Sequence, residues 1–298
     1  MSKELTIEQH TSELLVKHGL NFHIAKEPLV SKSQEGEYFI SPYYGLRNTK
    51  TNEVINSVKS GYTVSQNKEV VEMVLQGMAK FGKDLKVTKA GSINGGRRIF
   101  FQLEILGKAK VGTDTITRYV TLLDSNDGST GLSVGIGDTV AHCSNQFFRF
   151  YKGSNAKFRH TATITAKIAT IPNLIELALD ESLKQIKIYN AFESTPLTKH
   201  LADKMVKEIL GYDRVLTSIE DRAKLTNRSV KLMDDLYEAI EKECSIVGKN
   251  KWGLFNGLTR FTTHETKEYK HENGREESML IGRNYKKAMT GFNFLYTN

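Results

Sequence analysis

The sequence predicts an α+β protein, in which a helix and an antiparallel sheet of β-hairpins form the core and the C-terminal half is mostly helical. Between residues 85 and 141, apolar and polar positions alternate in segments separated by turn signals, which is typical of paired strands. From about residue 165, apolar residues return every three or four positions, which indicates helices. We therefore expect a basic α+β core domain over residues 1–165 and a helical region over residues 166–298.

The N-terminal part of the chain indicates the edge of a sheet followed by a helix. Residues 37–47 and 54–58 are rich in strand-forming side chains and flank a turn-rich segment, a pattern that predicts a hairpin. Ser65 or Asn67 can then cap a helix whose apolar residues follow the helical period. Gly82 stands where the C-cap of that helix belongs.

The middle of the chain predicts the main sheet. Asn94-Gly95-Gly96 and Asn126-Asp127-Gly128 are strong turn signals between alternating segments. Four strands are expected, at residues 85–90, 98–106, 115–123 and 130–141. A helix is then expected to begin near Ser144 or Asn145, to carry the aromatic residues that follow, and to end at Gly153.

The C-terminal half predicts a series of helices. Pro172 and Pro196 each suit the first position of a helix, and Gly211 suits the end of the second one. Apolar residues at helical spacing predict two further helices, at residues 230–240 and 252–261.

The positive charge is concentrated in the middle of the chain. The formal net charge is +8 and the pI is about 9.2. Residues 86–160 hold 11 basic and 5 acidic side chains, a net charge of +6, whereas residues 1–85 are neutral overall and residues 176–298 carry +1. A surface that binds a polyanion produces such a distribution, and a solvated charged face is the alternative.

The composition excludes several classes of protein. No apolar run approaches the roughly 20 residues of a membrane span, and the first residues lack the pattern of a signal peptide. The two cysteines, Cys143 and Cys244, form neither a disulfide framework nor a metal-binding motif. We expect a cytoplasmic protein that does not bind a membrane.

The motifs of catalysis and metal binding are incomplete. Residues 124–128 begin like a calcium loop and residues 264–268 like a zinc-protease helix, but each lacks a required ligand. His142 beside Cys143 could pair a base with a thiol nucleophile. Neighbouring residues of a strand point to opposite faces, however, which favours a buried structural cysteine. We expect no catalytic residue, no metal ion and no cofactor.

Basic and aromatic side chains are interleaved along the basic segment. Lys and Arg neutralise phosphates, while Tyr, Phe and Arg can stack on unpaired bases. The expected nucleic-acid contacts are Lys86, Lys89, Arg97, Arg98, Arg118, Tyr119, Arg149, Lys152, Lys157, Phe158 and Arg159. Among them, the arginines of the hairpin and the loop at residues 152–159 are expected to contact phosphates, with Tyr119 or Phe158 stacking. Burial in the core is the alternative for the aromatic residues.

Five segments resemble a known family in their sequence and in their order. They are VKSGYTVSQN at 58–67, AGSINGGRR at 90–98, DGS at 127–129, VAHCSN at 140–145 and KWGLFN at 251–256. Over about residues 35–265, the chain resembles the family catalogued as domain of unknown function 932, or phage/plasmid-like protein. This resemblance implies a role in the DNA metabolism of a bacteriophage or mobile element in the bacterial cytoplasm. His142 departs from the family pattern, which usually has a small or apolar residue before the cysteine.

The expected order of helix, β-hairpin, strand and helix is also similar to that of phage single-strand annealing proteins of the Red-beta type, although no motif is shared. That similarity implies a basic hairpin and groove that hold single-stranded DNA in rings or filaments of many copies.

Two functions therefore stay open. The first is a non-catalytic protein that binds and anneals single-stranded DNA as a homo-oligomeric ring or filament. The alternative is a protein-interaction factor of a phage or plasmid, for counter-defence or host takeover, whose near-neutral helical half binds a partner without nucleic acid. An enzyme acting on nucleic acid ranks behind both, because no nucleophile or metal constellation supports it.

Overall fold

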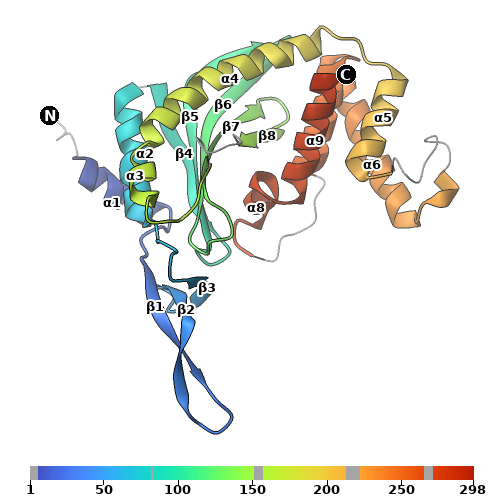
Figure 1. Ribbon diagram of the computed structural model, residues 1–298. Helices are drawn as coiled ribbons and strands as arrows, with labels where there is room; N and C mark the ends of the chain where they lie inside the picture. The colour runs from blue at the N-terminus through green and yellow to red at the C-terminus, as the bar shows by residue number, and fades with distance from the viewer. Residues whose placement is uncertain (1–5, 82–83, 151–156, 213–221, 265–270) are drawn as a thin grey trace.

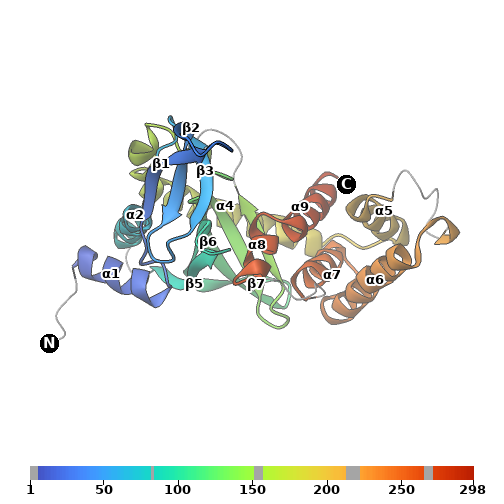
Figure 2. The ribbon, with the colours of Figure 1, turned by 90° about the horizontal axis from the view of Figure 1, so that it is seen from below.

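The computed structural model describes residues 6–81, 84–150, 157–212, 222–264 and 271–298, and it has the expected α+β fold. Two antiparallel sheets occupy one side of the molecule, and a group of helices occupies the other (Figure 1). Seen from below, the two parts form one elongated body, with α5, α6, α7 and α9 at one end (Figure 2). No described helix is both long enough and apolar enough to cross a membrane.

The main sheet follows the chain order, and each strand pairs antiparallel with the next. Its strands are β4 (Leu85–Ile93), β5 (Arg98–Val111), β6 (Asp114–Ser125), β7 (Leu132–Val140) and β8 (Gln146–Phe150), and β9 (Lys157–Phe158) also pairs with β7. The four strands expected between residues 85 and 141 are thus confirmed.

The helix expected to begin near Ser144 or Asn145 is wrong, because residues 146–150 form β8. The last residues of that expected helix lie outside the described part of the chain. Phe147 and Phe148 point to opposite faces of this strand, and each is buried in a different apolar cluster. A strand that is buried on both faces has a continuous apolar run, which does not distinguish a strand from a buried helix.

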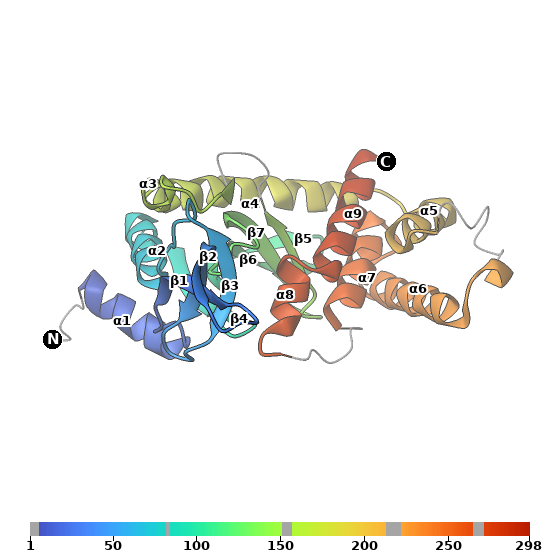
Figure 3. The ribbon, with the colours of Figure 1, turned by 60° about the horizontal axis from the view of Figure 1, so that its bottom comes forward.

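Helices cover the two faces of the main sheet. On one face, α2 (Asn67–Phe81) and α4 (Ile171–Glu193) bury alternate residues of the sheet, such as Ile99, Phe101 and Leu103. On the other face, α8 (Gly274–Leu280) packs against Phe100 and Leu123. The elements α1 (Ile7–Lys17) and α3 (Ile164–Ile168) flank α2 (Figure 3).

The small sheet projects from the body as an arm (Figure 1). It consists of β1 (Ile24–Lys32), β2 (Tyr38–Asn48) and β3 (Val54–Lys59), and the pairing of β2 with β3 confirms the expected hairpin. An apolar cluster at its base contains Ile24, Leu46 and Ile55. Towards the tip, beyond the end of β3, β2 pairs only with β1, and large apolar side chains are exposed there.

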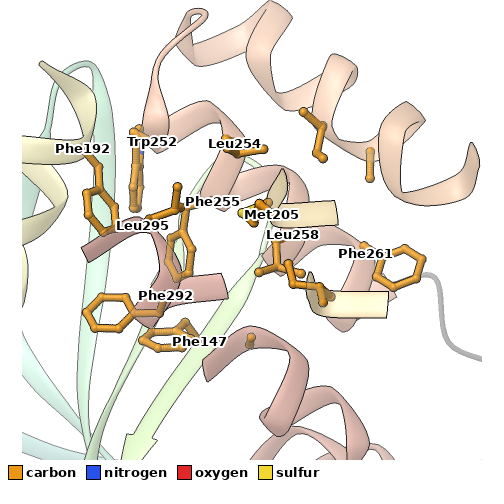
Figure 4. Close-up of a cluster of buried hydrophobic side chains, with 14 of the residues drawn as sticks. Phe147, Phe192, Met205, Trp252, Leu254, Phe255, Leu258, Phe261, Phe292 and Leu295 are labelled. Carbon is orange, nitrogen blue, oxygen red and sulfur yellow. The ribbon is translucent and has the colours of Figure 1, made fainter. Parts of the chain in front are cut away.

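The helical half has its own apolar cluster, which is rich in aromatic rings (Figure 4). It is built mainly by α5 (Lys199–Leu210), α6 (Asn227–Val247), α7 (Lys251–His264) and α9 (Arg283–Thr297). Helices α5, α6 and α7 confirm the expected ones, whereas α9 was not expected. The expectation that Pro196 holds the first position of α5 is wrong, because this helix begins at Lys199 with Thr198 as its N-cap. Pro196 instead pairs with Asn250, and the N–H of Leu197 donates to the carbonyl of Lys249, in the chain before α7. Gly211 ends α5 in the left-handed conformation, with φ of 73°.

The packing is continuous across residue 165, where two domains were expected to meet. The first half of α4 is buried with the main sheet, whereas Tyr189 and Phe192 near its end are buried with the helical half. Figure 3 shows α4 running along the molecule from α3 at one end towards α5 and α9 at the other. The division into residues 1–165 and 166–298 stays a prediction.

Candidate nucleic-acid interface

Three segments that are distant in the sequence meet beside the base of the arm and line two adjoining cavities. The segments are residues 56–62, which include the end of β3 and the chain just after it, residues 127–131 between β6 and β7, and residues 157–161. The cavities have volumes of about 700 and 520 Å³, and both are lined by Ser129, Thr130 and Lys157. We call the two cavities together the basic groove.

The loop at residues 127–131 has its shape fixed by local hydrogen bonds and by close packing. Asp127 accepts a hydrogen bond from the backbone N–H of Ser129 at 2.9 Å, which forms a tight turn through Gly128 with φ of 72°. A Cβ on Gly131 would lie 2.1 Å from the carbonyl oxygen of Phe158. Only glycine therefore lets the segment at residues 157–161 lie directly against this loop.

A buried polar network supports the wall of the basic groove. Ser65 Oγ donates to Asp124 Oδ2 at 2.6 Å, and His160 Nε2 lies 2.8 Å from Asp124 Oδ1. The ring of Tyr62 stacks on the ring of His160 with 5.1 Å between their centroids. The backbone N–H of Thr63 donates to the carbonyl of His160 at 3.1 Å. These contacts hold residues 157–161 against the chain that follows β3.

The same network contains a serine, a histidine and an aspartate, but its geometry does not suit nucleophilic catalysis. Ser65 donates its single hydroxyl proton to Asp124, so it does not donate that proton to the ring of His160, 3.3 Å away. The Ser65 side chain is also buried, so a substrate has no access to it. The arrangement supports a structural role for all three residues.

The buried residue Asn126 links three of the segments that carry the family resemblance. The side-chain amide of Asn126 donates to Asn67 Oδ1 at 3.3 Å and to the carbonyl of Gly96 at 3.0 Å. The backbone N–H groups of Asn126 and Asp127 both donate to the carbonyl of Arg97. Segments 58–67, 90–98 and 127–129 therefore meet next to the basic groove.

Among the charged side chains that line the basic groove, positive ones dominate. They are Lys59, Arg98, Lys157, Arg159 and Lys286. Arg98 is paired, since it contacts Glu277 and lies 3.7 Å from Asp127, the one carboxylate that lines the groove among the described residues. The other four cations have no ion-pair partner in the part of the chain that the structure describes. They lie on both cavities, with Lys157 shared between them.

Aromatic side chains also line the basic groove. Tyr62 lines one cavity, while Phe150 and Tyr285 line the other. Burial raises the pKa of Tyr62 far above its usual range, and the nearby carboxylates of Asp124 and Asp127 add to this effect. Tyr62 is therefore a neutral ring at any physiological pH.

The structure brings only part of the expected nucleic-acid contacts to the basic groove. Arg98, Lys157 and Arg159 line it, whereas exposed Lys86, half-buried Arg97 and half-buried Tyr119 do not. Lys152 lies outside the described residues.

Burial or pairing within the protein disfavours two of the expected contacts. Phe158 is 6% exposed in the apolar core, so it cannot stack on a base. Lys89 forms an ion pair with Glu276.

The expected contacts of Arg118 and Arg149 are disfavoured for the same reason. Arg118 is buried, its guanidinium donates to Ser182 and to a carbonyl, and burial lowers its pKa. Arg149 lies over the ring of Phe292 and 3.6 Å from Glu181. The carboxylate of Asp138 is fully buried, and this burial raises its pKa to about 6. The charges of Arg118 and Arg149 act in the opposite direction, because they favour the ionised form of Asp138.

Sequence reasoning missed five of the basic and aromatic residues of the groove: Lys59, Tyr62, Phe150, Tyr285 and Lys286. Lys59 and Tyr62 belong to segment 58–67, so the family resemblance was an available signal for them. Tyr285 and Lys286 lie on α9, more than 120 positions from the other cationic segment, and no sequence pattern connects them to it.

The described residues contain one group with the side chains and spacing of a metal site, at the other end of β7. It consists of His142, Cys143 and Glu243, whose ligand atoms all lie within 4.8 Å of one another. The expectation that His142 and Cys143 point to opposite faces is wrong, because both follow β7 in a turn. Burial raises the pKa of the Cys143 thiol to about 12, which argues against a thiolate nucleophile in the metal-free protein.

Comparison with known proteins gives one match. A family described as Domain of unknown function (DUF932) matches residues 54–285, which include Lys59, Arg98, Lys157, Arg159 and Tyr285 of the basic groove. No curated protein sequence and no solved structure matches the chain.

Proposed function

The chain belongs to the DUF932 family, and from the geometry of its basic groove we propose that it is a non-catalytic protein that binds and anneals single-stranded DNA for a bacteriophage or other mobile element. The observation that carries this proposal is the row of four unpaired cations along two adjoining cavities. Exposed Lys and Arg side chains without carboxylate partners are free to neutralise phosphates.

The distribution of these cations favours a polymer over a single nucleotide. Lys59 and Arg159 line one cavity, Lys286 lines the other, and Lys157 lies between them. A site for one phosphate group gathers its donors around one point, usually at the N-terminus of a helix. Cations spread along a continuous groove suit the successive phosphates of a nucleic-acid strand.

The aromatic lining favours a single strand over a duplex. Tyr62 and Tyr285 lie in the walls of the basic groove, beside the cations. Unpaired bases can stack on such rings, whereas the bases of a duplex stack on each other and present only their edges. The groove thus provides both components of single-strand recognition, charge for the backbone and rings for the bases.

The arm supports the self-assembly that annealing requires. Tyr38, Phe39 and Ile40 near its tip are 70%, 55% and 76% exposed. In the described part of the chain, β1 has no neighbour on its outer edge. An exposed apolar edge can pair with a strand of another chain, and we assign that role to a second copy of this protein.

The proposal is tested by titrating the full-length protein into a labelled single-stranded oligonucleotide, its duplex form and a labelled acidic peptide. We expect tight, salt-sensitive binding of the single strand, weaker binding of the duplex and little binding of the peptide. Mixing complementary strands with the protein should speed their pairing, as followed by fluorescence quenching. If the single strand fails to bind at low salt, the proposal is wrong.

The exposed arm also favours a second candidate, a protein-interaction factor that does not bind nucleic acid. The two functions separate in one experiment, the capture of partners from nuclease-treated bacterial lysate. A stoichiometric foreign protein that binds through the arm, together with no binding of DNA, would favour this second candidate.

A further inference from the structure

The turn after β7 places two potential metal ligands beside a helix of the other half of the molecule. Ser144 has a left-handed backbone with φ of 55°, and its N–H donates to the carbonyl of Val140 at 2.9 Å, which closes the turn. His142 and Cys143 lie within this turn and both approach Glu243 of α6. The distance between His142 Nε2 and Glu243 Oε2 is 3.6 Å.

Asp114 and Trp252 orient the ring of His142. Its Nδ1 lies 2.9 Å from Asp114 Oδ1, and Asp114 Oδ2 accepts a hydrogen bond from Trp252 Nε1 at 2.7 Å. A carboxylate only accepts, so Nδ1 donates to Asp114, and Nε2, which faces Glu243, is the ring nitrogen left available for a metal ion. Histidine ligands of zinc are commonly oriented by a carboxylate in this way.

Glu243 has one oxygen that the described protein leaves without a hydrogen bond. Its side chain is fully buried, and Oε1 accepts from Arg260 at 3.1 Å, but Oε2 has no donor among the described residues. A buried carboxylate oxygen without a partner is costly. A cation beside it would remove that cost, and Oε2 is the oxygen that faces His142.

We propose that His142, Cys143 and Glu243 bind a divalent transition-metal ion, with zinc as the preferred ion, and that Asp114 and Arg260 position the ligands. The nitrogen, sulfur and oxygen donors match the ligand types of zinc. In a tetrahedral zinc site the ligand atoms lie about 3.3–3.8 Å apart, so the 3.6 Å between His142 and Glu243 already fits. All three ligand atoms lie within 4.8 Å of one another, so side-chain movements of about 1 Å bring them to one ion.

The site has an exposed side, and it links the two halves of the molecule. The side chain of His142 is 31% exposed, which gives an ion a path from solvent and leaves space for water as a fourth ligand. His142 and Cys143 follow the main sheet, whereas Glu243 belongs to the helical half. Metal binding is therefore expected to stabilise the contact between them, independently of DNA binding at the other end of β7.

Cobalt substitution tests the proposal on the full-length chain. Metal-stripped protein is titrated with Co²⁺, and a thiolate-to-cobalt charge-transfer band is expected because Cys143 is a ligand. Cys143→Ser should abolish the band. Cys244→Ser, which changes the chain's other cysteine, should keep it. If wild-type protein gives no band, or if both serine variants lose it equally, the proposal is overturned.

Zinc titration by calorimetry gives an independent measurement. Wild-type protein is expected to bind one equivalent, and Asp114→Asn should weaken binding by about 10- to 100-fold, as loss of an orienting carboxylate does. Zinc should raise the Tm of wild-type protein but not of His142→Ala or Cys143→Ser. If His142 only forms an ion pair between the two carboxylates, zinc changes no Tm, which also overturns the proposal. Binding of single-stranded DNA by the metal-stripped protein should persist, so the two proposals fail separately.

Discussion

Replacing Lys157 and Arg159 together by Ala is a direct test of the basic groove. Both side chains are exposed and line the groove, and neither has an ion-pair partner among the described residues. The change therefore removes two positive charges without leaving a carboxylate unpaired. Exposed substitutions of this kind usually change the free energy of unfolding by less than about 0.5 kcal/mol, so the variant should fold normally.

The size of the effect follows from the number of phosphates that the groove can neutralise. Each neutralised phosphate of a single strand contributes about −0.7 to the slope of log K against log salt. The four unpaired cations of the groove then give a slope of about −2.8, and the double variant about −1.4. Taking 1 M salt as the concentration at which these contacts contribute nothing, the slope difference of about 1.4 over the tenfold range down to about 0.1 M salt corresponds to about 25-fold weaker binding.

Fluorescence anisotropy with a labelled oligonucleotide over a series of salt concentrations measures both the affinity and the slope. The matched control is Lys86→Ala with Lys108→Ala, which removes two exposed lysines that do not line the groove. This control should keep the wild-type slope. Equal losses of affinity in the two double variants would refute the reasoning, because overall charge would then explain the binding.

Three further predictions concern the arm, the buried carboxylate and the loop of the groove. Ile40→Ser at the arm should shift the protein from oligomer to monomer in light scattering with an unchanged Tm; an unchanged assembly would contradict the role of the arm. Because the pKa of Asp138 is raised to about 6, its burial costs stability above pH 6, and this cost disappears as the pH falls towards 4. As the pH falls from 7 to 4, chemical unfolding should show the free energy of unfolding of wild-type protein rising by up to about 3 kcal/mol relative to that of Asp138→Asn. If the free energies of the two proteins change in parallel with pH, the raised pKa of Asp138 is contradicted. Gly131→Ala should displace Phe158 and its neighbours, lower stability by about 1–3 kcal/mol and weaken DNA binding, while Gly61→Ala, where a Cβ meets no other atom within 4 Å, should do neither.

The fold was predictable where turn signals or helical spacing mark an element in the sequence. The strands β4 to β7 carry turn signals between alternating segments, and α2, α4 and α6 carry apolar residues at helical spacing, so their types were correct. β8 was wrong because its short apolar run is buried on both faces, which leaves no alternation, and because no Asn-Gly or Asp-Gly turn precedes it as one does before β5 and β7.

The candidate sites were less predictable because they depend on contacts between distant segments. The basic groove combines Lys59, Lys157 and Lys286, and only the fold brings these residues together. For Arg118 and Phe158, the residue types suggested contacts with DNA, but burial decides their role. The sequence analysis rejected a pairing of His142 with Cys143 because it placed both residues in a strand, whereas they lie in a turn.

The length of α4 has a consequence for how the protein unfolds. Its 23 residues extend about 35 Å, and the helix contributes side chains to both large apolar clusters. Melting either half would expose part of the same continuous helix, whose remaining turns would lose neighbours that stabilise them. The sheet half and the helical half should therefore denature in one cooperative transition, with a calorimetric enthalpy equal to the van't Hoff enthalpy.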